Sequence, residues 1–91
     1  MNNWSIFLYE FIISFVALIC IFLSVKNLGK FTPFVIGTII CIALLLGAHV
    51  NPAVSTLFIL TGKTGVSSLY VRVLPQIIAI IVVSILINLV T

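Results

Sequence analysis

Apolar residues dominate this chain, and short polar segments divide them into three long stretches and one short stretch. The long stretches cover about residues 4–25, 31–46 and 69–90. A bilayer core is roughly 30 Å thick, and a helix of about 20 apolar residues crosses it. The pattern therefore predicts an all-α membrane protein with three transmembrane helices. The short stretch, 55–60, lies between the second and third of these and needs a different explanation.

The sequence around the short stretch predicts a helix that crosses only half a membrane. Asn51 is a good N-cap, Pro52 suits a first helical turn, and Gly62 suits a helix end. A helix of about 10 residues is about 15 Å long, half of the bilayer core. Irregular backbone at that depth is tolerated only where it is buried in protein or lines an aqueous cavity. We therefore expect residues 47–62 to form a re-entrant loop and half-helix.

The composition indicates a multi-pass integral membrane protein. Of the 91 residues, 64% are hydrophobic and 5% are charged, which is more apolar surface than a soluble domain of this size can bury. The net charge of +3 comes from the single acid Glu10 and four cations in turns and at span ends, namely Lys26, Lys30, Lys63 and Arg72. These form no basic stripe, so we expect no nucleic-acid partner. No nucleophile–base pair or ligand cluster is visible, so we expect no enzyme, metal or cofactor.

The segment from Gly47 to Val54 reads Gly-Ala-His-Val-Asn-Pro-Ala-Val. It resembles the first signature loop of the aquaporin and glycerol-facilitator (major intrinsic protein) family. The resemblance runs from about Glu10 to the end of the chain and covers one of the family's two inverted repeats. It implies that residues 1–91 form a single half-aquaporin unit. Such a unit would be a subunit or half of a passive channel for water or small neutral solutes such as glycerol.

The resemblance also implies roles for the loop. Asn51, Pro52 and Ala53 would stand at the pore centre, where Asn51 would cap the half-helix and donate a hydrogen bond to a passing solute. Backbone carbonyls would accept hydrogen bonds along the path, namely those of Gly47, Ala48, His49 and Val50. The positive end of the half-helix dipole, roughly +0.5 charge, would oppose protons and cations. The His49 side chain is either a hydrogen-bonded spacer or a proton carrier.

The narrow filter of the family is only partly matched. The family's second loop usually continues with an arginine that forms part of the filter, whereas Val54 follows Ala53 here. Counting back from Asn51 without gaps puts Phe31 at an aromatic filter position, with Phe34 close by. The resemblance therefore implies a first-repeat loop and weaker discrimination against larger or charged solutes than in a typical water channel.

Polar residues inside two spans are candidates for supporting the loop. Glu10 and Ser14 resemble the family's Glu-x-x-x-Thr pattern, whose carboxylate hydrogen-bonds the backbone of the re-entrant loop. A carboxylate within a span is otherwise a functional-site hypothesis by default. Gln76 matches the Gln of the family's Gln-x-x-Gly-Ala pattern, although Ala79 and Ile80 replace the Gly and Ala. Gln76 would either line the pore or hydrogen-bond neighbouring helices.

Three spans and a half-helix cannot enclose a channel, so a partner is expected within the lipid bilayer. Alternating spans put two cations on each side of the membrane, so the positive-inside rule gives almost no orientation bias. An antiparallel homodimer, or pairing with a second half-channel, would rebuild the inverted repeats. Two alternatives stay open. One is a small dimeric proton-coupled exporter that uses Glu10, and the other is a non-transporting truncated or accessory membrane subunit.

Overall fold

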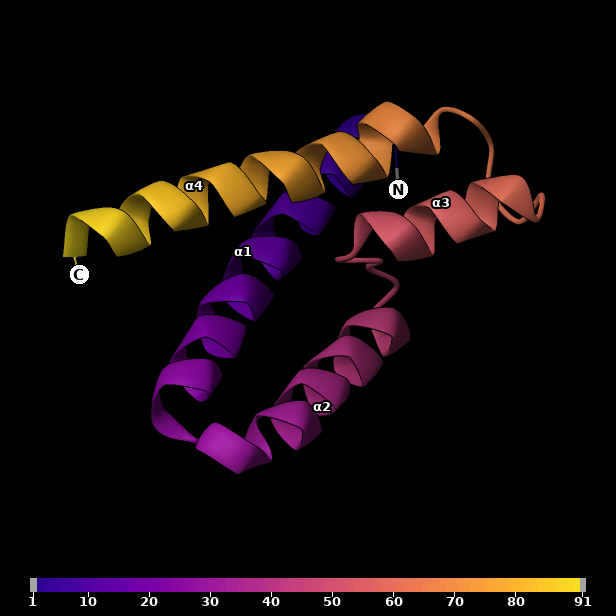
Figure 1. The fold of residues 1–91 in the computed structure, drawn as a ribbon. Helices are drawn as coiled ribbons and strands as arrows, with labels where there is room; N and C mark the ends of the chain where they lie inside the picture. The colour runs from indigo at the N-terminus through magenta and orange to yellow at the C-terminus, as the bar shows by residue number, and fades with distance from the viewer. Residues whose placement is uncertain (1, 91) are drawn as a thin grey trace.

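The computed structural model describes residues 2–90, and in this range the chain is entirely helical, without strands. The expectation of an all-α protein is confirmed. The elements in chain order are α1 (Asn3–Asn27), the 3₁₀-helix η1 (Gly29–Phe31), α2 (Thr32–Leu45), α3 (Pro52–Leu60), the π-helix η2 (Leu69–Val73) and α4 (Leu74–Val90). Figure 1 shows α2 folded back beside α1, α4 crossing the first half of α1, and α3 between the ends of α2 and α4.

Two continuous helices are long and apolar enough to cross a membrane: α1, with 25 residues, and the segment Leu69–Val90, with 22. The segment Gly29–Leu45 is also apolar but is shorter. Within Leu69–Val90, the π-helix ends at Val73, two residues before Pro75. Proline has no N–H to donate to the carbonyl four residues earlier, so the regular helical ladder is interrupted at this point.

Glycines end both α2 and α3 in the same way. Gly47 and Gly62 have φ angles of +84° and +78°, in the left-handed region that a side chain disfavours. After each glycine, the next N–H bonds back to a carbonyl in the last turn: Ala48 N to Ala43 O at 2.9 Å, and Lys63 N to Phe58 O at 2.9 Å. Both ends are Schellman motifs, which satisfy the orphan carbonyls and turn the chain sharply.

The small apolar core lies where α1, α2 and the loop after α2 meet. It consists of Ala17, Ala43, Ala48 and Val50, with larger side chains packed around it. Small residues at such positions allow helix backbones to approach closely. The largest fully buried side chains are mostly polar, namely Gln76, Glu10, Pro75, Ser14 and Ser55.

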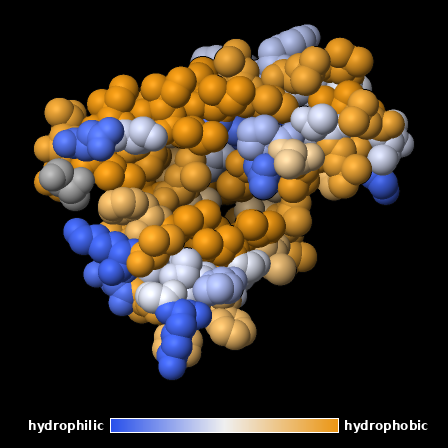
Figure 2. All heavy atoms as spheres, viewed as in Figure 1, coloured by the Kyte–Doolittle hydropathy of each residue, from blue (hydrophilic) through white to orange (hydrophobic). Residues whose placement is uncertain are grey.

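The surface is correspondingly apolar. Figure 2 shows hydrophobic residues covering most of the visible face. Large apolar side chains on α2, α3 and α4 are widely exposed, among them Leu45 at 86%, Leu60 at 79% and Leu89 at 77%. The chain thus buries polar groups and exposes apolar ones, the reverse of the usual distribution in a soluble domain.

Candidate functional site

The centre of the candidate site is the irregular segment between α2 and α3. Ala48, His49 and Val50 are all buried there. The Asn51 N–H donates to His49 O at 2.6 Å, which closes a γ-turn around Val50. Val50 has φ +63°, a rare conformation for a β-branched residue that costs of order 1–3 kcal/mol. The surrounding contacts must therefore hold this backbone in place.

Glu10 of α1 supplies those contacts. Its side chain is fully buried, and its carboxylate accepts the His49 N–H on both oxygens, at 3.0 and 2.9 Å. The Val50 N–H donates to Oε1 at 3.1 Å. These loop amides have no helical partner, so a carboxylate brought from another element satisfies donors that would otherwise be buried and unpaired.

Arg72 of η2 completes the environment of Glu10. Its Nη1 forms an ion pair with Glu10 Oε2 and donates to Gly47 O at 3.0 Å. One guanidinium nitrogen thus bridges α1 to the residue at which the loop begins. From the sequence, Arg72 is expected only at the end of a span, without a role in the site.

A second set of polar contacts leads from Glu10 to the ring of His49. Gln76 Nε2 lies 3.5 Å from Glu10 Oε1 and 3.0 Å from Ser55 Oγ. Ser55 Oγ in turn lies 2.8 Å from His49 Nδ1. Because a carboxylate only accepts hydrogen bonds, the nitrogen end of the Gln76 amide must face Glu10. The cluster therefore ties α1, α3, α4 and the loop together through polar side chains.

Not every polar atom in this cluster has a partner. Ser14 is fully buried one turn after Glu10, but its Oγ has no hydrogen-bond partner among residues 2–90, and the same holds for Gln76 Oε1. The structure therefore brings Glu10 and Gln76 to the loop, whereas Ser14 lies beside them without a polar contact.

Asn51 lies at the N-terminus of α3 with an exposed side chain. Its Oδ1 accepts the Ala53 N–H at 2.8 Å, which caps the helix, and Pro52 occupies the first helical position. The side-chain amide nitrogen has no acceptor among residues 2–90. Asn51 thus presents two free N–H donors beside the positive end of the helix dipole.

The four loop carbonyls differ in their contacts. Gly47 O accepts from Arg72, and His49 O accepts from Asn51 N. In the part of the chain that the structure describes, Ala48 O and Val50 O have no donor. Ala48 has no exposed surface, so a solute cannot reach its carbonyl in this chain, and Val50, which is 9% exposed, offers the unpaired acceptor.

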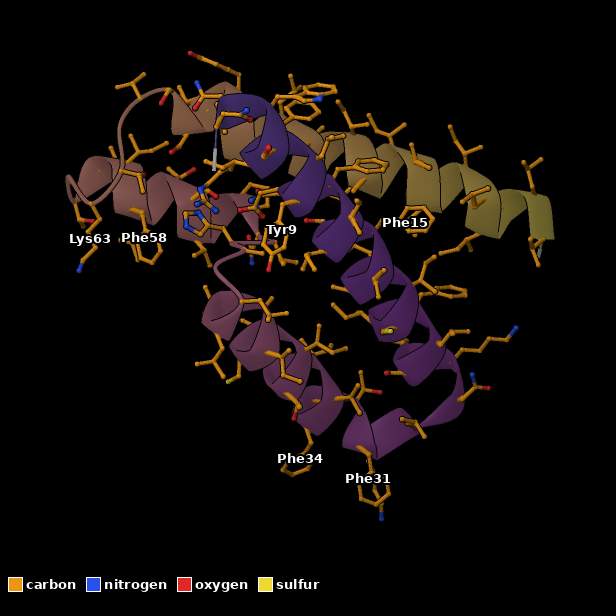
Figure 3. The ribbon with its side chains drawn as sticks, turned by 180° about the vertical axis from the view of Figure 1, so that it is seen from behind. Tyr9, Phe15, Phe31, Phe34, Phe58 and Lys63 are labelled. Atoms are coloured by element: carbon orange, nitrogen blue, oxygen red, sulfur yellow. The ribbon has the colours of Figure 1, made fainter. Side chains whose placement is uncertain are left out.

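Phe31 lies far from this cluster. Figure 3 shows Phe31 and Phe34 at the corner between α1 and α2, away from Tyr9 and Phe58. Phe31 is 57% exposed, and Lys30 Nζ lies 5.6 Å from its ring centroid. Among residues 2–90, no ring contact joins Phe31 to a loop residue.

Two aromatic side chains join the cluster that the sequence analysis did not name. Tyr9 Oη donates to Leu46 O at 2.6 Å, next to the loop. The Phe58 ring packs edge-on against His49, with ring centroids 4.9 Å apart. Tyr9 precedes Glu10 directly, and Phe58 lies on α3, so both hold the loop between α1 and α3 (Figure 3).

Residues 2–90 contain no group of three or more His, Cys, Asp or Glu side chains that could hold a metal ion.

Comparisons with models of known families, with curated proteins and with solved structures find no match to this chain.

Proposed function

We propose that this chain is one half of a passive membrane channel for water or small neutral solutes, an aquaporin-like unit of three spans and a re-entrant half-helix. The observation that carries the proposal is the buried Glu10 carboxylate, which accepts the N–H groups of His49 and Val50 from an irregular loop. In water, solvent could satisfy those amides. At membrane depth only protein can do so, and this arrangement makes a re-entrant loop stable.

The distribution of side chains supports a membrane location. Lipid solvates exposed apolar residues, and its core cannot satisfy polar groups, so polar residues of a membrane protein gather inside. The fully buried Glu10, Ser55 and Gln76 and the exposed leucines follow this rule. In the proposed layout α1, the segment Gly29–Leu45 and the segment Leu69–Val90 are the spans.

The half-helix defines the permeation path. α3 has nine residues and is about 14 Å long, so it can reach from one membrane surface to about the midplane. Its N-terminus would lie there, with the Asn51 N–H donors and the unpaired Val50 carbonyl facing the path. A neutral molecule that both donates and accepts hydrogen bonds can replace its hydration shell with these groups, whereas the helix dipole opposes cations.

A second half must close the path, because the Asn51 side chain is exposed in this chain rather than enclosed. An antiparallel second copy, inserted in the opposite orientation, would bring two Asn51 side chains and two half-helix N-termini together at the midplane. A different half-channel would serve the same purpose. In either case the partner covers the open side of the loop.

The test is osmotic shrinkage of proteoliposomes that contain the full chain, followed by stopped-flow light scattering. We expect water permeability well above that of empty vesicles. The variant Asn51→Asp keeps the capping oxygen but loses the amide donors, so we expect it to fold and to conduct less. A correctly inserted wild-type chain with the permeability of empty vesicles refutes the proposal.

Accessibility tests the re-entrant layout separately. Single cysteines at positions 51 and 62, in a chain with Cys20 and Cys41 replaced by alanine, are treated with membrane-impermeant thiol reagents. We expect position 62 to be labelled from one side only and position 51 poorly from either side. Efficient labelling of the two positions from opposite sides would mean that this segment spans the membrane fully.

A further inference from the structure

Arg72 offers hydrogen-bond donors that the protein does not use. A guanidinium has five N–H groups in a rigid planar fork. Nη1 directs its two toward Glu10 Oε2 and Gly47 O. The three on Nε and Nη2 have no acceptor among residues 2–90. The head group is therefore fixed on one edge and free on the other.

The free edge of Arg72 must meet water or another polar group. The Arg72 side chain is 19% exposed, whereas its partner Glu10 is fully buried. Each donor left unsatisfied in lipid costs several kcal/mol, so a guanidinium held at this depth cannot turn its free edge toward acyl chains. The accessible side of Arg72 therefore marks the aqueous approach to the loop, next to Gly47, where the loop begins.

The charges of this approach restrict what can pass. Donors from His49, Val50 and Arg72 occupy both oxygens of Glu10, so the carboxylate offers no free acceptor to a solute. What a solute meets is the outer edge of a cation. The buried Glu10 carboxylate lies behind the guanidinium, so the pair is neutral at a distance and attracts anions only weakly, whereas a cation that comes close meets the positive N–H groups first. The groups in reach favour neutral molecules with oxygen acceptors.

From these observations we propose that Arg72 is a specificity-determining residue of the half-channel. Its free N–H groups bind the oxygen atoms of small neutral solutes, such as polyols or urea-type amides, and its charge excludes cations at the mouth of the loop. This inference rests on the proposed channel function and adds a donor ahead of the Asn51 amide along the same path.

The shape of the guanidinium matters as well as its charge. A lysine at this position could pair with Glu10, but its compact ammonium has three donors and no rigid fork. It cannot hold Glu10 and Gly47 O and also present a planar edge to a solute. The two functions that we assign to Arg72 can therefore be separated by substitution.

The experiment measures three quantities in proteoliposomes of the full chain: water permeability, glycerol uptake and methylammonium uptake. The variants are Arg72→Lys and Arg72→Gln. Lys63→Gln serves as the matched control, because it removes a cation whose side chain has no contact with the loop among residues 2–90. Before reconstitution, the size-exclusion profile of each variant in detergent is used to check that it is folded.

We expect Arg72→Lys to lower the ratio of glycerol to water permeability about threefold or more and to keep methylammonium out. Arg72→Gln is expected to lower the same ratio and also to admit methylammonium, and Lys63→Gln to match the wild type. An unchanged ratio in Arg72→Lys overturns the inference, even where Arg72→Gln does not fold. A wild-type chain that conducts nothing overturns the channel proposal and the inference together, whereas conduction with an unchanged ratio overturns the inference alone.

Discussion

Replacing Glu10 with glutamine perturbs the polar cluster at its centre with almost no change in volume. Both oxygens of the wild-type carboxylate accept: Oε1 from His49, Val50 and Gln76, and Oε2 from His49 and Arg72. A glutamine amide has one accepting oxygen and one NH₂ group. Whichever way the amide turns, its NH₂ group faces a donor. The variant Glu10→Gln also leaves the guanidinium without its counter-charge.

The cost follows from these two losses. Removing one partner of a buried ion pair costs about 3–5 kcal/mol. Arg72 is 19% exposed and keeps some solvation, so we take the lower end, about 3 kcal/mol. A buried N–H left without an acceptor costs about 1–3 kcal/mol more. We expect Glu10→Gln to destabilise the fold by about 4 kcal/mol, a large share of a typical total.

The assay is reversible unfolding in mixed micelles with increasing SDS fraction, followed by circular dichroism. The set comprises Glu10→Gln, Arg72→Gln and the double variant. Removing both charges leaves neither one buried alone, so the double variant should be more stable than the sum of the single effects predicts, by on the order of 2 kcal/mol. Strictly additive effects would falsify the ion-pair reasoning. A Glu10→Gln variant of normal stability that loses pH-driven substrate exchange would favour the exporter alternative instead.

Three further predictions test other parts of the structure. Gly62→Ala should destabilise the chain by about 1–2 kcal/mol, because φ is +78° there, whereas Gly37→Ala, in the interior of α2 with open space around it, should cost nothing in the same unfolding assay. Ser55→Ala should cost about 1–3 kcal/mol by leaving Gln76 Nε2 without its better acceptor, and equal stability of the two chains would contradict the role of the hydroxyl. C-terminal fusions to one reporter active only in the cytoplasm and another active only outside should both be active if oppositely inserted copies pair. Activity of only one fusion rules out the antiparallel homodimer.

The sequence predicted the helical elements well because their limits depend on local chemistry. Asn51 and Pro52 were expected to begin a helix and Gly62 to end it, and α3 spans Pro52–Leu60 with Asn51 as its cap and Gly62 in the left-handed region. Caps and Schellman ends involve neighbours within a few residues. The π-helix Leu69–Val73 was not predicted.

Hydrophobic patterning could not predict how the helices face one another. In a soluble helix the apolar stripe marks the buried face. Here apolar residues cover nearly every face, since lipid would accept them as readily as a protein core does. The informative positions are the few polar residues within the predicted spans, because lipid could not satisfy them. This reasoning and the resemblance select Glu10, the resemblance alone selects Ser14 and Gln76, and the structure brings Glu10 and Gln76 into contact with the loop and its neighbours but leaves the Ser14 hydroxyl without a partner among residues 2–90.

The same reasoning could have identified Arg72. A chain with one acid inside a predicted span needs a donor for that acid, and only four side chains carry a positive charge. Lys26 lies at the end of α1, Lys30 in η1 and Lys63 after α3, and all three are exposed. Arg72 instead lies one helical turn before Gln76, so the two share a face, and Gln76 already pointed at the loop. The ion pair can therefore be predicted from the sequence if each buried charge is assigned a partner. Assigning every cation near a span end to the membrane surface misses it.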